Sequence, residues 1–337
     1  MSAFKIRSLV AALGLVLLLP GVSAMAAERT FKLSAGDPID APGPQGARKF
    51  AELLQARSQD NLKVKVYPSA MLGNDVQMLG ALPGGTLDFA LVGAPTLVGL
   101  VKEFGVLDLP YQFNSAEEVD TMLDGPLGQQ LLSRLESKGL VGLGFWEIGF
   151  RDVSNSKRPI QRWEDLKGLK IRTVQSPIFR TFFDHLGANA QPMPINEVFS
   201  ALETRAIDAQ ENPVSVIAAQ RFNEVQPYLS LTEHIYTAYV LLMSKKVWDS
   251  LEPAQREQIV AAANEARSYQ RQLAREANEQ RLADLEASGM KVNRIDAIER
   301  QRFVEQAQQV IGRNGETIGA EFLAAWQAEL GKQRGAQ

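Results

Sequence analysis

The feature that most constrains the fold is a run from residue 253 to residue 288 that contains no glycine and, after its first position, no proline. Glycine and proline are the residues that most destabilise a helix interior, so the run predicts one helix of 36 residues. At about 1.5 Å per residue, that helix is about 54 Å long. This length exceeds a single small lobe, and we therefore expect the helix to lie across two lobes.

Short apolar strands alternate with amphipathic helices in two successive series upstream of this helix. The first series has expected strands at 30–34, 62–67 and 87–92 and expected helices at 45–57 and 75–82. The second has expected strands at 170–173, 190–192 and 207–210 and expected helices at 177–186 and 195–204. An apolar strand at 140–146 separates the series, and we expect it to cross between the lobes. Strand–helix–strand order is typical of largely parallel sheets, so the predicted fold class is α/β with two lobes.

The N-terminus has the layout of a secretory signal peptide. Lys5 and Arg7 precede an apolar stretch of 11 residues, 9 to 19, and Ala24-Met25-Ala26 supplies a small-residue cleavage site. A membrane-spanning helix needs roughly 20 apolar residues, so this stretch is too short to be an anchor. We expect residues 1–26 to be removed, with Ala24 as an alternative cleavage point, and the rest of the chain to be exported to the periplasm.

Composition excludes several classes of function. The 337 residues include no cysteine, which rules out thiol catalysis, disulfides and thiolate metal sites, and only two histidines, which rules out a histidine-rich metal centre. The formal net charge is −3, and removal of Lys5 and Arg7 leaves 34 basic against 39 acidic residues, or −5. This balance argues against a nucleic-acid partner. We therefore expect no nucleic acid, no metal and no cofactor.

Catalytic templates are missing as well. The chain has no G-x-S-x-G, H-E-x-x-H, P-loop or G-x-G-x-x-G sequence. His185 and His234 are interpreted as structural histidines. Acidic residues are plentiful, but the sequence pairs no two of them across a cleft, so a glycosidase remains an unsupported alternative. The sequence thus predicts no catalytic residue and favours a protein that is not an enzyme.

Arg172 is the most informative polar residue, because it lies inside the expected strand at 169–174, just ahead of the helix start Ser176-Pro177. The carboxyl-terminal edge of an open α/β sheet is where ligands bind. A guanidinium is a planar, permanently charged group that suits a carboxylate. The alternative is an edge arginine held in a structural ion pair.

Two further residues lie at similar positions. Asn212 stands before Pro213, between a strand and a helix, where it either caps that helix or donates to the same ligand as Arg172. Arg151 follows the apolar crossover strand and is placed to reach a cleft between the lobes.

Together with the motifs around them, these residues make the chain resemble the substrate-binding proteins of tripartite ATP-independent periplasmic (TRAP) transporters, of the dicarboxylate-binding DctP type. The resemblance rests on the order and spacing of several short motifs: Gly149-Phe150-Arg151, Asn155 to Ile160, Asp165 to Arg172, Leu186 to Asn189, Pro192-Met193-Pro194, Glu197-Val198-Phe199, Ala201-Leu202-Glu203, Asp208 to Pro213 and Ser244 to Trp248. It covers essentially the whole chain after the signal peptide.

The resemblance implies two α/β lobes hinged around a cleft, with the long helix spanning both. It implies lobe I at 27–149 plus 238–277, and lobe II at 150–237 plus 278–331. An arginine at the position of Arg172 clamps the ligand carboxylate in this family, the asparagine at Asn212 bonds the same carboxylate, and the arginine at Arg151 supports it.

Five further residues complete the set of candidate ligand contacts. Asp75 and Asp37 are candidates for contacts to ligand hydroxyls, with helix and turn caps as the alternative. Gln175, Ile195 and Trp146 complete the candidate set, although relatives often carry an aromatic residue at the position of Ile195. Residues 91–94 lack the acidic residue that sialic-acid binders use nearby, so a smaller organic acid is expected: a sugar acid, a hydroxy acid or a C4-dicarboxylate.

The expected partners are a small carboxylate ligand and the two integral membrane subunits of a TRAP transporter, and the expected oligomeric state is a monomer. The principal alternative is a binding protein of the same fold that serves an ATP-driven transporter or a sensor. The second alternative is an exported enzyme.

Overall fold

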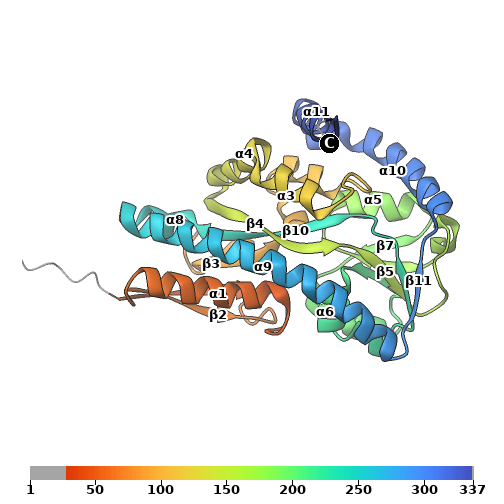
Figure 1. Cartoon of the computed structure of the whole chain (residues 1–337), viewed down its shortest axis with the longest axis horizontal. Helices are drawn as coiled ribbons and strands as arrows, with labels where there is room; N and C mark the ends of the chain where they lie inside the picture. The colour runs from red at the N-terminus through yellow and green to blue at the C-terminus, as the bar shows by residue number, and fades with distance from the viewer. Residues whose placement is uncertain (1–27, 336–337) are drawn as a thin grey trace, which may run out of the picture.

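Two mixed β-sheets, one in each half of the molecule, form the framework of the computed structural model, which describes residues 28–335 (Figure 1). The predicted signal peptide lies outside the described residues. The first sheet has the order β2-β1-β3-β10-β4 and defines lobe I; the second has the order β11-β9-β5-β8-β6-β7 and defines lobe II. The predicted α/β class with two lobes is confirmed.

The lobe I sheet contains both parallel and antiparallel pairs. Its strands are β1 (Arg29–Ala35), β2 (Leu62–Tyr67), β3 (Phe89–Gly93), β4 (Leu140–Phe150) and β10 (Tyr236–Ser244). Strand β1 pairs parallel with β2 and β3, while β10 pairs antiparallel with β3 and β4. Every residue of β3 and β10 is buried, because helices cover both faces of the sheet.

The lobe II sheet is built from short strands. They are β5 (Asp152–Asn155), β6 (Lys170–Thr173), β7 (Asn189–Pro192), β8 (Ala209–Asn212), β9 (Tyr228–Leu231) and β11 (Lys291–Arg294). Strand β6 runs parallel to β7 and β8, and β5 runs antiparallel to β8 and β9. The sequence pattern did not predict β5, β9 or β11, each of which is only four residues long.

Helices cover the faces of both sheets. In lobe I they are α1 (Pro42–Arg57), α2 (Asp75–Ala81), α3 (Ala116–Asp124), α4 (Pro126–Arg134) and α8 (Lys245–Asp249); in lobe II they are α5 (Pro177–His185), α6 (Ile195–Glu203) and α7 (Val214–Ala219). Short 3-10 helices occupy η1 (Ala94–Leu97), η2 (Lys102–Asp108), η3 (Leu135–Lys138), η4 (Trp163–Leu166) and η5 (Phe222–Glu224). No helix within residues 28–335 combines the length and the apolar character that a membrane crossing requires.

The long helix predicted from the absence of glycine and proline is α9, which runs from Pro253 to Ala287 over 35 residues. Figure 1 shows it crossing the molecule from one lobe to the other. Ala262 and Ala266 pack in the lobe I core, whereas Leu285 packs in the lobe II core near the other end. Ion pairs from Arg271 to α3 also attach the lobe I half of α9. The prediction that this helix lies across both lobes is confirmed.

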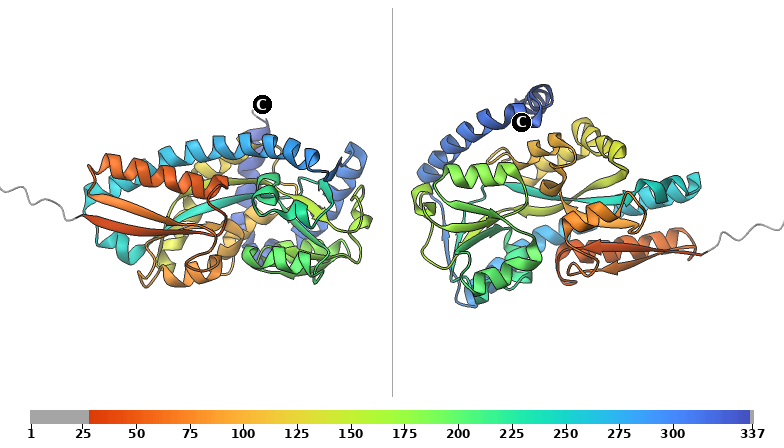
Figure 2. Two further views of the ribbon diagram at one scale, coloured as in Figure 1. Left: turned by 90° about the horizontal axis from the view of Figure 1, so that it is seen from below. Right: turned by 180° about the vertical axis from the view of Figure 1, so that it is seen from behind.

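The C-terminal helices α10 (Ala297–Ile318) and α11 (Ala320–Gly335) form a second connection between the lobes. Phe303 packs in a lobe II core cluster, but Ile318 and Trp326 belong to the core of lobe I. Figures 1 and 2 show α10 and α11 running along one side of the molecule past both sheets. The sequence division assigned 278–331 to lobe II, yet the apolar face of α11 packs on lobe I.

A glycine explains how the chain turns back. Gly319, between α10 and α11, has φ +107°, a conformation that other residues rarely adopt. The chain can therefore change direction there, and Trp326 then donates a hydrogen bond from Nε1 to Oε1 of Gln112 in lobe I (3.1 Å). Gly312 and Gly315 lie inside α10, which continues through both.

Candidate functional site

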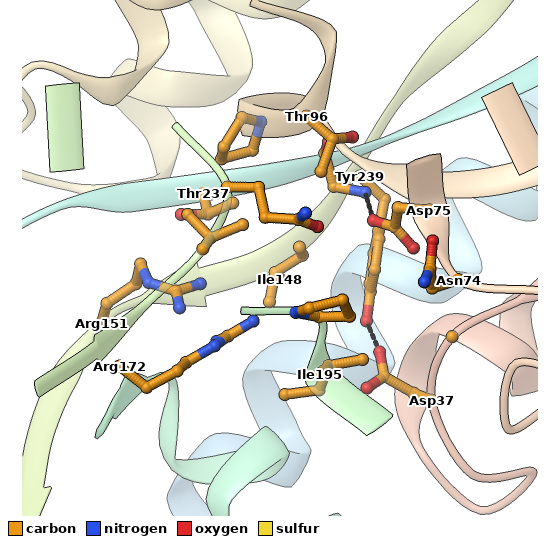
Figure 3. A pocket seen from close by; sticks show the side chains of 16 residues that line it. Asp37, Asn74, Asp75, Thr96, Ile148, Arg151, Arg172, Ile195, Thr237 and Tyr239 are labelled. Carbon is orange, nitrogen blue, oxygen red and sulfur yellow. Dashed lines mark hydrogen bonds between the residues drawn. The ribbon is translucent and has the colours of Figure 1, made fainter. Parts of the chain in front are cut away.

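A pocket lies between the two lobes, where loops from both sheets meet (Figure 3). Lobe I contributes residues just after β1 and β3 and at the start of α2, and lobe II contributes residues from β6 and from the start of α6. Parallel strands such as β1, β3 and β6 present their carboxyl ends to loops, which is where α/β sheets bind ligands. Strands β4 and β10 supply three more residues to the pocket wall: Ile148, Thr237 and Tyr239.

Arg172 lines the pocket from β6 and makes no ion pair with any described residue. Its side chain is 3% exposed, and its Nε and Nη2 both donate to the carbonyl oxygen of Met193, at 2.9 and 2.6 Å. Burial lowers its pKa to about 10, which still leaves the guanidinium charged at neutral pH. A buried cation without a carboxylate partner is unfavourable, so an incoming anion gains a strong contact here.

Arg151 lines the same pocket but is already neutralised. Its Nε and Nη2 donate to the Glu211 carboxylate at 2.5 and 3.0 Å, and Nη2 also donates to Oδ1 of Asn212 at 2.9 Å. The guanidinium lies over the Phe179 ring, 5.4 Å from its centre. The Arg151 guanidinium lowers the pKa of Glu211 against the opposing effect of burial, so the pair is ionised.

His234 extends this buried group on the side away from the pocket. Its Nε2 lies 3.3 Å from Oε2 of Glu211, and its Nδ1 lies 2.8 Å from Oγ1 of Thr232. Burial is the main cause that lowers the pKa of His234. A neutral imidazole can donate from Nε2 to the carboxylate while Nδ1 accepts from Thr232, which satisfies both ring nitrogens. The sequence interpretation of His234 as a structural histidine agrees with this arrangement.

The lobe I wall of the pocket carries two carboxylates. Asp75 lies at the first position of α2 and accepts a hydrogen bond from the Gly93 amide at 3.0 Å. Burial raises its pKa to about 6, and the nearby Asp37 acts in the same direction. Asn74, beside it, caps α2 by accepting from the Gln77 amide. Figure 3 shows Asp75 and Asn74 on the wall opposite the tips of Arg151 and Arg172.

Asp37 joins the two lobes as well as lining the pocket. Its Oδ2 accepts a hydrogen bond from the Tyr239 hydroxyl, and its Oδ1 accepts from Nε2 of Gln220, which follows α7 in lobe II (2.9 Å). A second bridge runs from Oγ of Ser176 in lobe II to Asp108 in lobe I, at 2.6 Å. The two lobes are thus hydrogen-bonded to each other through Asp37 and Gln220 and through Ser176 and Asp108.

The structure brings six of the eight predicted site residues to the pocket: Asp37, Asp75, Arg151, Arg172, Gln175 and Ile195. Asn212 lies one layer behind, where its amide bonds Arg151 and Gln210. Trp146 is fully buried in the lobe I core and does not line the pocket. No group of three or more histidines or acids within residues 28–335 is arranged to hold a metal ion.

Sequence reasoning missed several residues that line the pocket, among them Asn74, Thr96, Thr237 and Tyr239. A usable signal exists for Thr237 and Tyr239, because two polar groups two positions apart in an apolar strand share one face. Thr237 is buried and its hydroxyl has no hydrogen-bond partner among the described residues. Thr96 lies three residues after the carboxyl end of β3. Because β3 pairs parallel with β1, the topology alone places this position near the site.

The chain resembles several proteins of known binding activity. The family model described as bacterial extracellular solute-binding protein, family 7 (DctP) matches residues 36–316. The 2,3-diketo-L-gulonate-binding periplasmic protein YiaO of Escherichia coli K12 is 41% identical over 257 residues, 76% of this chain and 78% of that protein.

Two solved structures share the whole architecture. The sugar acid binding protein DctPAm of Advenella mimigardefordensis, in complex with galactonate, is 37% identical with a TM-score of 0.89 and covers 91% of this chain and 99% of its own. A TRAP periplasmic solute-binding protein of Sulfurospirillum deleyianum with bound succinate is 31% identical, with a TM-score of 0.86 over 90% and 99% of the two chains. These relatives are solute-binding proteins, not enzymes, and the chain belongs to the DctP family of bacterial extracellular solute-binding proteins.

Proposed function

We propose that this chain is the extracytoplasmic receptor of a TRAP transporter and that it captures a small monocarboxylate carrying several hydroxyl groups, of the sugar-acid type. The ligand carboxylate binds Arg172, supported by Arg151, and its hydroxyl groups contact the lobe I wall. The membrane subunits of the transporter are the proposed partners, and the periplasm is the proposed compartment after cleavage near Ala26.

The observation that carries this proposal is the state of Arg172. Its guanidinium reaches the pocket while Nη1 makes no hydrogen bond with any described residue and no carboxylate pairs with it. Arg151 beside it is compensated by Glu211, so the pocket retains one uncompensated positive charge on the lobe II side. One ligand carboxylate matches that charge.

The acidic lobe I wall favours hydroxyl groups over a second carboxylate. Burial raises the pKa of Asp75 to about 6, so the carboxyl is mostly ionised at neutral pH, and within residues 28–335 it accepts one hydrogen bond, from a backbone amide. A ligand hydroxyl can donate to it, whereas a second carboxylate would face a like charge in a poorly solvated site. The relatives are named for both kinds of ligand, so this wall is the feature that separates a sugar acid from a C4-dicarboxylate.

Isothermal titration calorimetry with galactonate, 2,3-diketo-L-gulonate and succinate at pH 7.5 tests the proposal. Tight stoichiometric binding of one or both sugar acids, with succinate weaker by at least about tenfold, is the expected result. Tighter binding of succinate would overturn the sugar-acid assignment. The assignment as a carboxylate receptor would be overturned if none of the three acids binds and a thermal-shift screen of about a hundred organic acids also finds no ligand.

The alternative partner, an ATP-driven transporter or a sensor, is separated by reconstitution. Uptake of the bound acid into vesicles that carry TRAP membrane subunits, driven by an ion gradient without ATP, supports the proposal. Uptake that needs ATP would contradict it.

A further inference from the structure

The long helix α9 holds the ligand site from behind through one asparagine. Asn278 lies in the lobe II half of α9 and is half-buried. Its Oδ1 accepts a hydrogen bond from the backbone amide of Ser215 at 2.9 Å. Ser215 is the second residue of α7, the helix that begins immediately after Asn212 and Pro213.

This contact replaces a cap that α7 lacks. The residue before α7 is Pro213, which has no side-chain oxygen to accept the free amide hydrogens of the first turn. Val216 and Ile217 bond the Pro213 carbonyl, but the Ser215 amide needs an acceptor from elsewhere. Asn278 supplies it from a different helix, so the start of α7 is fixed to α9 and not only to its own chain.

The amide nitrogen of Asn278 faces the second segment of the site. A Cβ placed on Gly149 would lie 2.9 Å from Nδ2 of Asn278 and 3.5 Å from the Pro213 Cβ. Gly149 has φ +124°, so its glycine is required by conformation as well as by space. Asn278 is therefore packed against the strand β4 two residues before Arg151.

Asn278 and Arg151 belong to one closed ring of contacts. Asn278 accepts a hydrogen bond from Ser215, which is three residues after Asn212. Asn212 in turn accepts a hydrogen bond from Arg151 at 2.9 Å. Arg151 is two residues after Gly149, and Gly149 packs on Asn278, which closes the ring. Strand β4 is an edge strand of its sheet, so this part of it has no neighbouring strand on the α9 side. Gln270, two turns earlier on α9, bonds both the amide and the carbonyl of Glu147 at 2.8 and 2.7 Å and holds the same edge.

We propose that Asn278 is a positioning residue for the ligand site: it sets the end of β8, which carries Asn212, against the end of β4, which immediately precedes Arg151, and so fixes the Arg151 guanidinium in the pocket. The inference rests on the proposed function, because it assumes that Arg151 supports the ligand carboxylate. Its consequence is that substitution of Asn278, which does not line the pocket, lowers the affinity for every carboxylate ligand by the same factor.

The test compares Asn278→Ala, Asn278→Asp and the control Asn264→Ala, an exposed asparagine on the same helix. Calorimetry with galactonate, 2,3-diketo-L-gulonate and succinate gives Kd, and a thermal melt of the ligand-free protein gives Tm. Asn278→Ala should raise Kd about tenfold for each acid that the unsubstituted protein binds. Asn278→Asp keeps an oxygen acceptor for the Ser215 amide and should bind within about threefold of the unsubstituted protein.

A Tm that falls while Kd stays unchanged in Asn278→Ala would overturn the inference, because it would assign Asn278 a structural role alone. Equal loss of affinity in Asn278→Asp would also overturn it, and that variant carries the test if Asn278→Ala does not fold. An unsubstituted protein that binds none of the acids would instead contradict the proposed function, so the two failures are distinguishable.

Discussion

The two walls of the pocket carry opposite charges, and they differ in how much of that charge is already paired. On the lobe II wall, Arg151 has a buried carboxylate partner, whereas Arg172 bonds only a backbone carbonyl among the residues that the structure describes. On the lobe I wall, Asp37 is held by Tyr239 and Gln220, while Asp75 accepts only one amide. Each wall thus pairs one committed residue with one that keeps capacity for a ligand. The committed members should matter most for stability, with Arg151 also supporting the ligand, and the uncommitted members should matter most for binding.

The largest expected effect breaks the committed pair on the lobe II wall. Arg151→Ala leaves Glu211 buried, 0% exposed, with only His234 beside it. Removal of one partner of a buried ion pair costs about 3–5 kcal/mol, so the free energy of unfolding in urea should fall by about that much. Arg221→Ala, which breaks an exposed Arg–Glu pair, is the control and should cost less than about 1 kcal/mol. Similar losses in both variants would show that the pairing difference is unimportant.

The uncommitted arginine should give the opposite pattern. Arg172→Ala removes a buried charge that has no carboxylate partner, so the free energy of unfolding of the ligand-free protein should change little. Affinity for the bound acid should fall by about a hundredfold or more, or about 2.7 kcal/mol, by calorimetry. Arg180→Ala on the exposed face of α5 is the matched control. Affinity like that of the unsubstituted protein would remove Arg172 from the site.

Asp75→Asn should change which acid is preferred. The substitution removes the charge that opposes a second carboxylate, so the ratio of galactonate to succinate affinity should fall by at least about tenfold. The same ratio in the unsubstituted protein should fall as pH drops through about 6, because the Asp75 carboxyl takes up a proton there. Asp40→Asn, an exposed lobe I acid outside the pocket, should leave the ratio unchanged. If the affinity ratio stays the same after the Asp75→Asn substitution and after the drop in pH, the lobe I wall does not discriminate between the two acids.

The last prediction concerns the pH dependence of stability at the same residue. Burial raises the pKa of Asp75 above its unfolded value of 3.8, so the folded state holds its proton more tightly and loses stability as pH rises from about 4 to about 6. Asp75→Asn should therefore raise Tm at pH 8, and the gain should disappear by pH 4. A constant difference between pH 4 and pH 8 would show that Asp75 titrates normally in the ligand-free protein.

Local rules predicted the parts of the fold that single segments determine. The helix α9 follows from 35 positions without an internal breaker, and Arg172 stood out because it lies inside a short strand just ahead of a helix start. Strands β5 and β11 were not predicted, although β6, β7 and β8 are equally short. The difference is that β5 and β11 lie outside the repeated strand–helix series and pair with strands that are distant in sequence. The placement of α11 was equally hidden, since it depends on the conformation of Gly319.

The site was predictable where topology alone brings residues together. Arg172 follows from its place near the carboxyl end of β6, and Asp75 was a candidate at the start of α2 on the facing lobe. Trp146 was misplaced because a large aromatic residue at a crossover fits a cleft and a core equally well in sequence, and in the structure it packs against Gly46 in the lobe I core. Asn212 lies behind Arg151 because its amide oxygen and nitrogen are both used by neighbouring side chains, which no local pattern reveals.

The return of α11 to lobe I has a consequence for how the molecule folds during synthesis. The lobe I core contains Leu97 and Phe104 from early in the chain together with Trp326 and Leu330 from its last turns. Lobe I therefore cannot complete its core before α11 has been synthesised. We expect this lobe to stay incompletely packed until α11 is available, so its folding depends on a segment more than two hundred residues downstream of Leu97.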